Sequence, residues 1–243
     1  MKDSLKPLAC ATFLALSACP ALAQDGDWEF EASIYLFTPE TDVSIGGLEG
    51  TLSFSDALDN LDMAFMGAFG ARNGRLSFLA DFMLTDISFG NDSPGPAFSS
   101  LETKFKTQVF SGYAAYSVYQ DPTVNVDLAA GFRWFDTSTS MTLTPGAAPG
   151  RSVSVSENWV DPVVGVRAMF DLSDKWSGLV FADYGGFRSD SETWQILLTA
   201  NYHINEKWVA RFGYRQLSVD HEINGSDFSF DQSGPIFGAT YRF

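Results

Sequence analysis

Hydrophobic and polar residues alternate with a period of two along most of the chain after residue 27. Between residues 124 and 134 the even positions are all apolar, whereas Asn125, Asp127 and Arg133 occupy odd ones. Such alternation predicts a β-strand with one apolar face. The pattern recurs ten times and therefore predicts ten strands, at residues 28–37, 63–72, 76–85, 103–119, 124–135, 160–170, 176–184, 194–203, 208–215 and 236–243.

The final strand indicates what the apolar faces contact. Phe237, Ala239, Tyr241 and Phe243 share one face, and the residues between them are mostly small or polar. This arrangement is typical of the closing strand of a bacterial outer-membrane barrel, with lipid outside and a polar lumen inside. After the N-terminal segment, no run of ~18 apolar residues is long enough for a membrane-spanning helix. Only a closed sheet then satisfies every backbone group within a bilayer.

The connections between these strands alternate strictly between short and long. Short turns are predicted at Asn73-Gly74, Gln120–Pro122, Ser173-Asp174 and Asn205-Glu206, and long loops at 39–60, 90–101, 137–152, 185–192 and 220–232. Outer-membrane barrels have short periplasmic turns and long external loops. The sequence thus predicts an all-β fold, a transmembrane antiparallel up-and-down barrel of ten strands. Twelve result if residues 43–45 and 51–54 add a hairpin to the wall; eight would require discarding two clear alternations.

A soluble β-sandwich would also show alternation, but it needs no aromatic residues at its strand ends. Here aromatic residues gather near strand ends on the apolar face, as they do at membrane interfaces. We predict that Trp28, Trp134, Trp194, Trp208, Tyr241 and Phe243, with Tyr184 and Tyr202, form such belts. They favour the membrane barrel.

Residues 1–23 have the features of a secretory signal peptide. Lys2 and Lys6 precede an apolar stretch from Leu8 to Leu16, and Ala21-Leu22-Ala23 is a small-x-small cleavage site. The barrel then comprises residues 24–243, located in the outer membrane of a Gram-negative cell envelope. An alternative is lipidation at Cys19, because Leu16-Ser17-Ala18-Cys19 resembles a lipoprotein processing box.

Charge and cysteine content exclude several classes of function. Both cysteines, Cys10 and Cys19, lie in the signal segment, so cleavage after residue 23 leaves no disulfide or thiolate site. The formal charge is −15, and loss of Asp3, Lys2 and Lys6 makes it −16. An acidic chain of this kind does not favour nucleic-acid binding.

The inward face of the predicted barrel carries opposite charges. Asp161, Asp183, Arg133, Arg167 and Arg215 are expected to form a layer of ion pairs that largely closes the lumen. A lone charge in a narrow interior is costly, whereas opposite neighbours offset that cost. The alternative is a charged constriction that selects solutes. A ten-stranded barrel leaves little free bore, because eight strands are just filled by side chains.

Candidate catalytic and metal-binding residues are few. His203 lies beside a predicted periplasmic turn, and Asp220 and His221 should point to opposite faces of one strand. No nucleophile and base are brought together by spacing, so we predict that the protein is not an enzyme. Residues 56–62 follow a possible helix cap at Ser55, but their acids do not match a calcium loop. We therefore expect no metal site and no cofactor.

Several segments resemble a family of uncharacterised proteobacterial outer-membrane barrel proteins. They are Trp159–Gly165, Ala182–Phe187, Ser191–Gln195, Phe212–Arg215 and Phe54–Arg72. The resemblance implies the fold and the location, and it transfers no activity to any residue.

The expected function is either a structural role or porin-like passage of small solutes, with a lumen largely closed by ion pairs. Alternatives are a hydrolase at the external rim, either a protease or a lipid-modifying barrel, and an adhesin or receptor acting through acidic loops. Expected partners are outer-membrane lipids, lipopolysaccharide and the barrel-assembly machinery, which would engage the C-terminal strand ending at Phe243.

Overall fold

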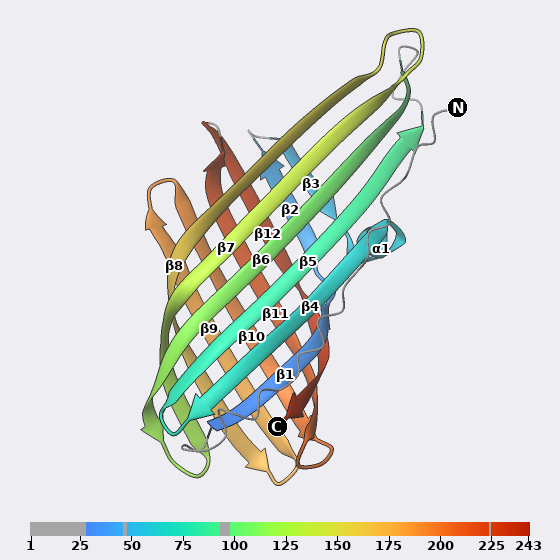
Figure 1. Cartoon of the computed structure of the whole chain (residues 1–243). Helices are drawn as coiled ribbons and strands as arrows, with labels where there is room; N and C mark the ends of the chain where they lie inside the picture. Colours follow the sequence, from blue (N-terminus) through green and yellow to red (C-terminus); the bar gives the residue numbers. More distant parts are fainter. Residues whose placement is uncertain (1–27, 46–47, 93–97, 224) are drawn as a thin grey trace, which may run out of the picture.

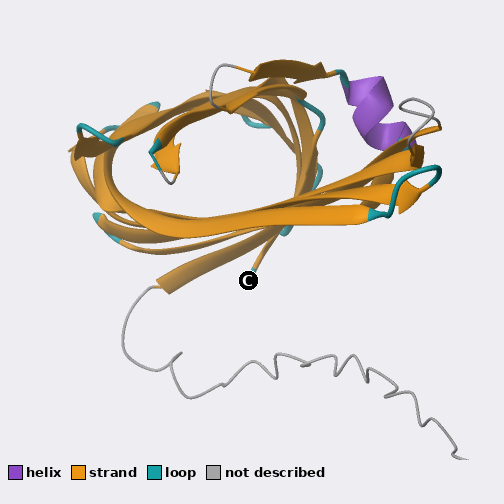
Figure 2. Ribbon diagram, turned by 90° about the horizontal axis from the view of Figure 1, so that it is seen from above, coloured by secondary structure: helices purple, strands orange, loops and turns teal. Residues whose placement is uncertain are grey.

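The computed structural model describes residues 28–45, 48–92, 98–223 and 225–243 and shows a closed antiparallel β-barrel (Figure 1). Ten strands form the wall: β1 Trp28–Phe37, β4 Leu61–Asn73, β5 Leu76–Asp92, β6 Phe98–Gln120, β7 Val124–Pro145, β8 Arg151–Ser173, β9 Trp176–Arg188, β10 Ser191–His203, β11 Trp208–Ile223 and β12 Ser226–Arg242. Each pairs with its neighbours in this order, and pairing of β1 with β12 closes the ring seen in Figure 2. The prediction of a ten-stranded barrel is confirmed. The predicted signal segment, with Cys10 and Cys19, lies outside the described residues.

Two further strands lengthen the wall at one end. β2 (Glu40–Ile45) continues the line of β1 along β12: β1 pairs with residues 236–242 and β2 with residues 228–233. β3 (Leu48–Leu52) then pairs with β2 as a hairpin. The sheet therefore contains twelve strands, of which ten close the barrel.

A six-residue helix, α1 (Phe54–Asp59), connects β3 to β4. The backbone N–H of Asp56 donates to the Oγ of Ser53 at 3.2 Å, which is the hydrogen bond of an N-terminal cap. The capping residue is thus Ser53, and the expectation of a cap at Ser55 is wrong because Ser55 already lies inside the helix. Among the described residues no helix is long and apolar enough to cross a membrane.

The two ends of the barrel differ, and we call them the turn end and the loop end. The turn end carries the four short connections and Arg242, the last residue of β12. The first connection is Gly74–Arg75 rather than Asn73-Gly74, because Asn73 pairs directly with Leu76. Gly74 has a φ of +55°, so this turn needs a residue that tolerates the left-handed region.

At the loop end, strands replace most of the predicted loops. β5, β6, β7 and β8 contain 17, 23, 22 and 23 residues and protrude beyond the rest of the barrel (Figure 1). Thr139, for example, lies in the predicted loop 137–152 yet pairs with Phe105 and Val155. Serine, threonine, proline and glycine dominate these segments and indicated loops, although Val153 and Val155 on β8 do alternate with serines.

The two faces of the wall separate as the alternation predicts. On β7 the outward Leu128 is 52% exposed, whereas the neighbouring inward Asp127 is fully buried. Outward apolar residues with high exposure occur around the whole barrel, including Ile34, Phe65, Phe132, Val164 and Phe237. A continuous apolar outer surface with buried polar groups inside reverses the arrangement of a water-soluble domain.

Candidate functional site in the barrel lumen

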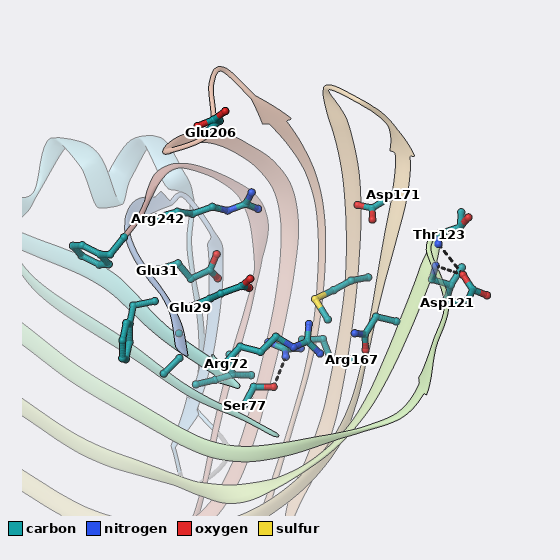
Figure 3. Close-up of a pocket in the computed structure, with 18 residues that line it drawn as sticks. Glu29, Glu31, Arg72, Ser77, Asp121, Thr123, Arg167, Asp171, Glu206 and Arg242 are labelled. Carbon is teal, nitrogen blue, oxygen red and sulfur yellow. Dashed lines mark hydrogen bonds between the residues drawn. The ribbon is translucent and has the colours of Figure 1, made fainter. Parts of the chain in front are cut away.

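A cavity of about 620 Å³ opens at the turn end of the lumen (Figure 3). It is lined by residues near the ends of β1, β4, β5, β7, β8 and β12 and by residues of the adjoining turns. Its charged lining residues are Glu29, Glu31, Arg72, Asp121, Arg167, Asp171, Glu206 and Arg242. We call this cavity the vestibule.

The floor of the vestibule is a group of two arginines and one aspartate. Arg72 of β4 and Arg167 of β8 both donate to the carboxylate of Asp127, which is fully buried on β7. Arg72 also donates to the Oγ of Ser117 at 2.7 Å, and Arg167 to the Oγ of Ser77 at 3.0 Å. Two guanidinium groups therefore share one carboxylate, which leaves the floor with a net positive charge.

The mouth of the vestibule, which is its open end, is lined by more carboxylates than arginines. Arg211 donates to both carboxylate oxygens of Glu31, at 3.0 and 2.9 Å, and Arg242 lies 3.3 Å from the Nδ1 of His203. Glu29 and Asp171 are exposed, and within the described part of the chain neither has an ion pair inside 4.0 Å. Figure 3 shows Glu29 and Glu31 pointing into the space between the floor and Arg242.

The turn between β6 and β7 contributes a preorganised carboxylate at the rim. The Asp121 side chain accepts hydrogen bonds from the Tyr119 hydroxyl at 2.5 Å and from the backbone N–H groups of Thr123 and Val124. These bonds, the Tyr119 bond first, hold the pKa of Asp121 below its ordinary value. Asp121 consequently remains charged in mildly acidic conditions.

Halfway along the lumen, Arg133 is the centre of a buried polar network. Its guanidinium donates to both oxygens of Asp183 at 2.8 Å, to the Thr193 hydroxyl at 2.8 Å and to the Tyr113 hydroxyl at 3.0 Å. Gln195 donates to both Asp183 and the Tyr113 hydroxyl. The side chains of Arg133 and Asp183 have no exposed surface.

A second ion pair lies across the lumen from β11. Arg215 donates to Asp81 of β5 at 3.0 Å and to the Tyr35 hydroxyl of β1 at 3.1 Å. Tyr35 in turn donates to Asp81 at 2.7 Å. The guanidinium carbon also lies 5.8 Å from the centre of the Phe37 ring, within the distance of a cation–π contact.

Towards the loop end the lumen becomes apolar. A buried cluster is formed by Phe37, Met66, Met83, Val109, Phe135, Trp159, Leu217, Val219, Phe228 and Phe230. Beside it, Asp161 accepts from the Oγ of Ser191, from the Nε1 of Trp159 at 3.0 Å and from Arg188 at 3.3 Å. His221 stacks on Trp159 with ring centres 4.2 Å apart.

The five lumen residues singled out from the sequence thus belong to four groups. Arg133 pairs with Asp183, but Arg167 pairs with Asp127, Arg215 with Asp81 and Asp161 with Arg188. The expected single layer does not form. The alternation in the sequence shows that Asp127 and Asp81 face the lumen. It does not show which arginine pairs with each of them, because that depends on the curvature of the barrel wall.

The predicted interface aromatics all lie on the outward face. Near the turn end, Trp208 packs against Tyr241 with ring centres 5.0 Å apart, and Tyr241 against Phe243 at 5.2 Å. Trp28 stacks on Phe78 at the same end. Trp134 and Trp194 lie further along β7 and β10, towards the loop end.

The separation of Trp194 and Tyr202 along β10 gives the height of the apolar band on the outer surface of the barrel. They are eight residues apart on one strand, about 26 Å of chain at ~3.3 Å per residue. A tilt of about 40° reduces this to a height of roughly 20 Å. That height is comparable with the apolar band of about 25 Å in outer-membrane barrels.

Comparisons with known proteins agree with this architecture. No protein-family model and no curated protein sequence matches the chain. Among solved structures, the outer-membrane protease OmpT from Escherichia coli has a TM-score of 0.56 and 11% identity, covering 88% of this chain and 97% of OmpT. The translocator domain of autotransporter NalP from Neisseria meningitidis has a TM-score of 0.42 and 15% identity, covering 90% and 89%. Ail of Yersinia pestis has a TM-score of 0.40 and 11% identity, covering 90% and 100%. The likeness to OmpT shows that the fold is that of an outer-membrane β-barrel.

The likeness to OmpT corrects one sequence prediction. The chain was expected not to be an enzyme because no nucleophile–base pair could be identified by spacing. OmpT is a protease, so a barrel of this fold supports catalysis, and the expectation of a non-enzymatic protein is contradicted. At 11% identity the likeness concerns the fold and identifies no catalytic residue in this chain.

Proposed function

We propose that the protein is an outer-membrane barrel that is closed at rest and admits a small polar solute into its periplasmic vestibule. The turn end faces the periplasm in this proposal, because short turns are periplasmic in outer-membrane barrels. The outward aromatic residues near both ends and the apolar band between them support a position across the membrane, whereas the orientation rests on the short turns alone. The vestibule is the observation that carries the proposal: an open, charged cavity that ends on buried side chains.

Two successive obstacles support a closed resting state. The Arg133 network and the Arg215 pair occupy the middle of the lumen, and the apolar cluster around Phe135 and Leu217 follows towards the loop end. These four side chains are at most 2% exposed. A passing solute has to displace them, and each buried ion pair is costly to break because a lone buried charge remains.

Solute flux into proteoliposomes tests this proposal. The wild type should give slow or undetectable swelling in a small zwitterion such as glycine. Replacing Arg133, Asp183, Phe135 and Leu217 together by alanine removes the central pair without leaving a lone charge and also opens the apolar cluster behind it, so flux should rise. The double variant Lys104→Ala/Glu102→Ala is the matched control, because it removes an exposed ion pair at the loop end. Fast wild-type swelling would contradict the closed state.

A hydrolase acting at the external rim is a second candidate function, favoured by a specific juxtaposition. Ser191 and His221 are direct cross-strand partners on β10 and β11, and the Ser191 Oγ donates to Asp161. A serine, a histidine and an aspartate therefore meet at the loop end of the lumen. Ser191 is buried and hydrogen-bonded to the acid rather than to the histidine, so catalysis would require a rearrangement of this contact.

An activity screen separates the two candidates. Purified protein is incubated with fluorogenic peptide and phospholipid substrates, alongside His221→Ala and Ser191→Ala variants. Turnover that disappears in both variants would establish the hydrolase. Turnover that both variants retain would exclude these residues as its source.

A further inference from the structure

We propose that the vestibule binds a compact zwitterion with its anionic group on the arginine floor and its cationic group among the acids of the mouth. This inference rests on the proposed entry of solute at the turn end, and it adds the chemical class and orientation of the ligand. A cavity of about 620 Å³ is within the usual range of small-molecule sites, about 300–1,000 Å³.

The floor has unused capacity for an anion. Arg72 and Arg167 share the single carboxylate of Asp127, so one positive charge is not compensated there. The Nε of Arg72 is also buried, and no hydrogen-bond partner is found for it in the described part of the chain. Guanidinium groups bind carboxylates and phosphates through paired N–H donors. An incoming anionic group would both neutralise the floor and accept from this N–H.

The mouth has unused capacity for a cation. Glu29 lies directly opposite Arg72 in the pairing of β1 with β4, yet the Arg72 guanidinium turns to Asp127 instead. Glu29 therefore remains exposed beside the cavity, and Asp171 is exposed on the β8 side. Glu31 differs from them because Arg211 already neutralises it.

The acidic mouth followed by the positively charged floor disfavours ligands that carry only one charge. A free anion must pass the carboxylates of the mouth before it reaches the floor, and a free cation meets the excess positive charge of the floor. A neutral solute gains neither attraction. A molecule with both charges matches both regions at once, and complementary potentials of this kind govern specificity.

The vestibule also contains a neutral hydrogen-bond acceptor for which the described residues supply no partner. The Oδ1 of Asn125 is buried, lines the vestibule and accepts no hydrogen bond from the described residues. It is an acceptor, whereas the Arg72 Nε is a donor. The carboxylate of an amino acid or peptide accepts from the Arg72 Nε–H, and its ammonium or peptide N–H donates to the Asn125 Oδ1, so amino acids and short peptides are the ligand class that fits best.

Saturation-transfer NMR with detergent-solubilised full-length protein tests the proposal. The probes are glycylglycine as the zwitterion, acetate as the anion alone and ethylamine as the cation alone. Glycylglycine should bind at least about tenfold more tightly than either fragment, because charged hydrogen bonds add at both ends. Equal binding of one fragment, or no binding of glycylglycine, would overturn the proposal.

Two variants test the two ends separately. Glu29→Gln should weaken glycylglycine and ethylamine about tenfold and leave acetate unchanged; Arg72→Gln should weaken glycylglycine and acetate instead. Because Arg72 also contacts the buried Asp127, only Glu29→Gln is decisive if Arg72→Gln misfolds. Lys104→Gln and Glu102→Gln are matched controls at the loop end, and unchanged binding is expected in both. Unchanged binding in Glu29→Gln would contradict the proposed orientation.

The result is independent of the swelling experiment. Glycylglycine binding together with fast wild-type swelling would preserve the vestibule site and reject the closed lumen. Slow swelling without binding would reject the zwitterion site alone.

Discussion

At the residue scale, arginine side chains in the lumen often bypass the acid directly opposite them. Arg133 faces Asp161 in the pairing of β7 with β8, yet it binds Asp183 of β9. Arg72 likewise bypasses Glu29 for Asp127. Arg167 is the contrasting case, because its register partner Asp127 is also its ion-pair partner. A long guanidinium side chain crosses the lumen easily, so the nearest acid along the wall is not always the nearest in space.

Arg133→Met should destabilise the barrel strongly, because Asp183 would remain buried without its cation. We expect a loss of about 3–5 kcal/mol in unfolding free energy. Urea unfolding in detergent, followed by heat-modifiable gel migration, measures this loss. Arg188→Gln is the control, since its side chain is 49% exposed and Asp161 retains Ser191 and Trp159. Its cost should remain below about 1 kcal/mol. Equal losses in the two variants would contradict the account of the Arg133 network.

The pKa of Asp121 should rise when Tyr119 is changed to phenylalanine. The Tyr119 hydroxyl is the largest cause of the lowered pKa, and the two backbone N–H donors remain in the variant. A carboxyl with a lowered pKa contributes stability above its ordinary value of 3.8, and this contribution is lost as pH falls through the lowered pKa. NMR titration of the Asp121 carboxyl carbon in both proteins measures the shift. An identical pKa in the variant would show that the backbone donors alone set it.

At the element scale, close approach of neighbouring strands depends on glycine. A Cβ on Gly131 of β7 would lie 1.9 Å from the carbonyl oxygen of Gly112 on β6, which is far inside any permitted contact. Gly178 of β9 is a matched contrast, since the nearest atom to its added Cβ is 3.8 Å away.

Gly131→Ala should therefore lower stability or prevent folding, whereas Gly178→Ala should be tolerated. Overpacking of this kind typically costs about 1–3 kcal/mol. The fraction of heat-modifiable protein after refolding into detergent measures both variants under the same conditions. Normal refolding of Gly131→Ala would show that β6 and β7 separate more easily than their close packing indicates.

The sequence predicted the number, order and facing of the wall strands, because lipid contact imposes apolar alternation on each one. It did not predict the length of β6, β7 and β8. Their ends at Phe98, Pro145 and Arg151 lie in segments rich in serine, threonine, proline and glycine, which indicated loops and outweighed the short alternation of Val153 and Val155 with serines. It also did not predict the vestibule, because Arg167 was expected in a layer with Asp161 and Asp183 and not beside Arg72 and Asp127. Their convergence depends on the closure of the barrel, which joins strands far apart in sequence.

At the scale of the whole molecule, the lumen changes character from one end to the other. Charged residues surround the open vestibule, ion pairs and hydrogen-bonded polar groups fill the middle, and aromatic and aliphatic side chains occupy the loop end. Most side chains of the vestibule are at least partly exposed, whereas Arg133, Asp183 and Arg215 in the middle and the loop-end cluster are buried. This order favours entry from the turn end and opposes free passage through the barrel.

Single-channel recording in planar bilayers tests the closed lumen most directly. The wild type should give very small currents or none, because Arg133, Arg215, Phe135 and Leu217 occupy the path. The variant in which Arg133, Asp183, Phe135 and Leu217 are all replaced by alanine should show discrete openings, and Lys104→Ala/Glu102→Ala should behave as the wild type. Large, steady, ion-selective currents from the wild type would contradict the account, because they would mean that these side chains line an open pore.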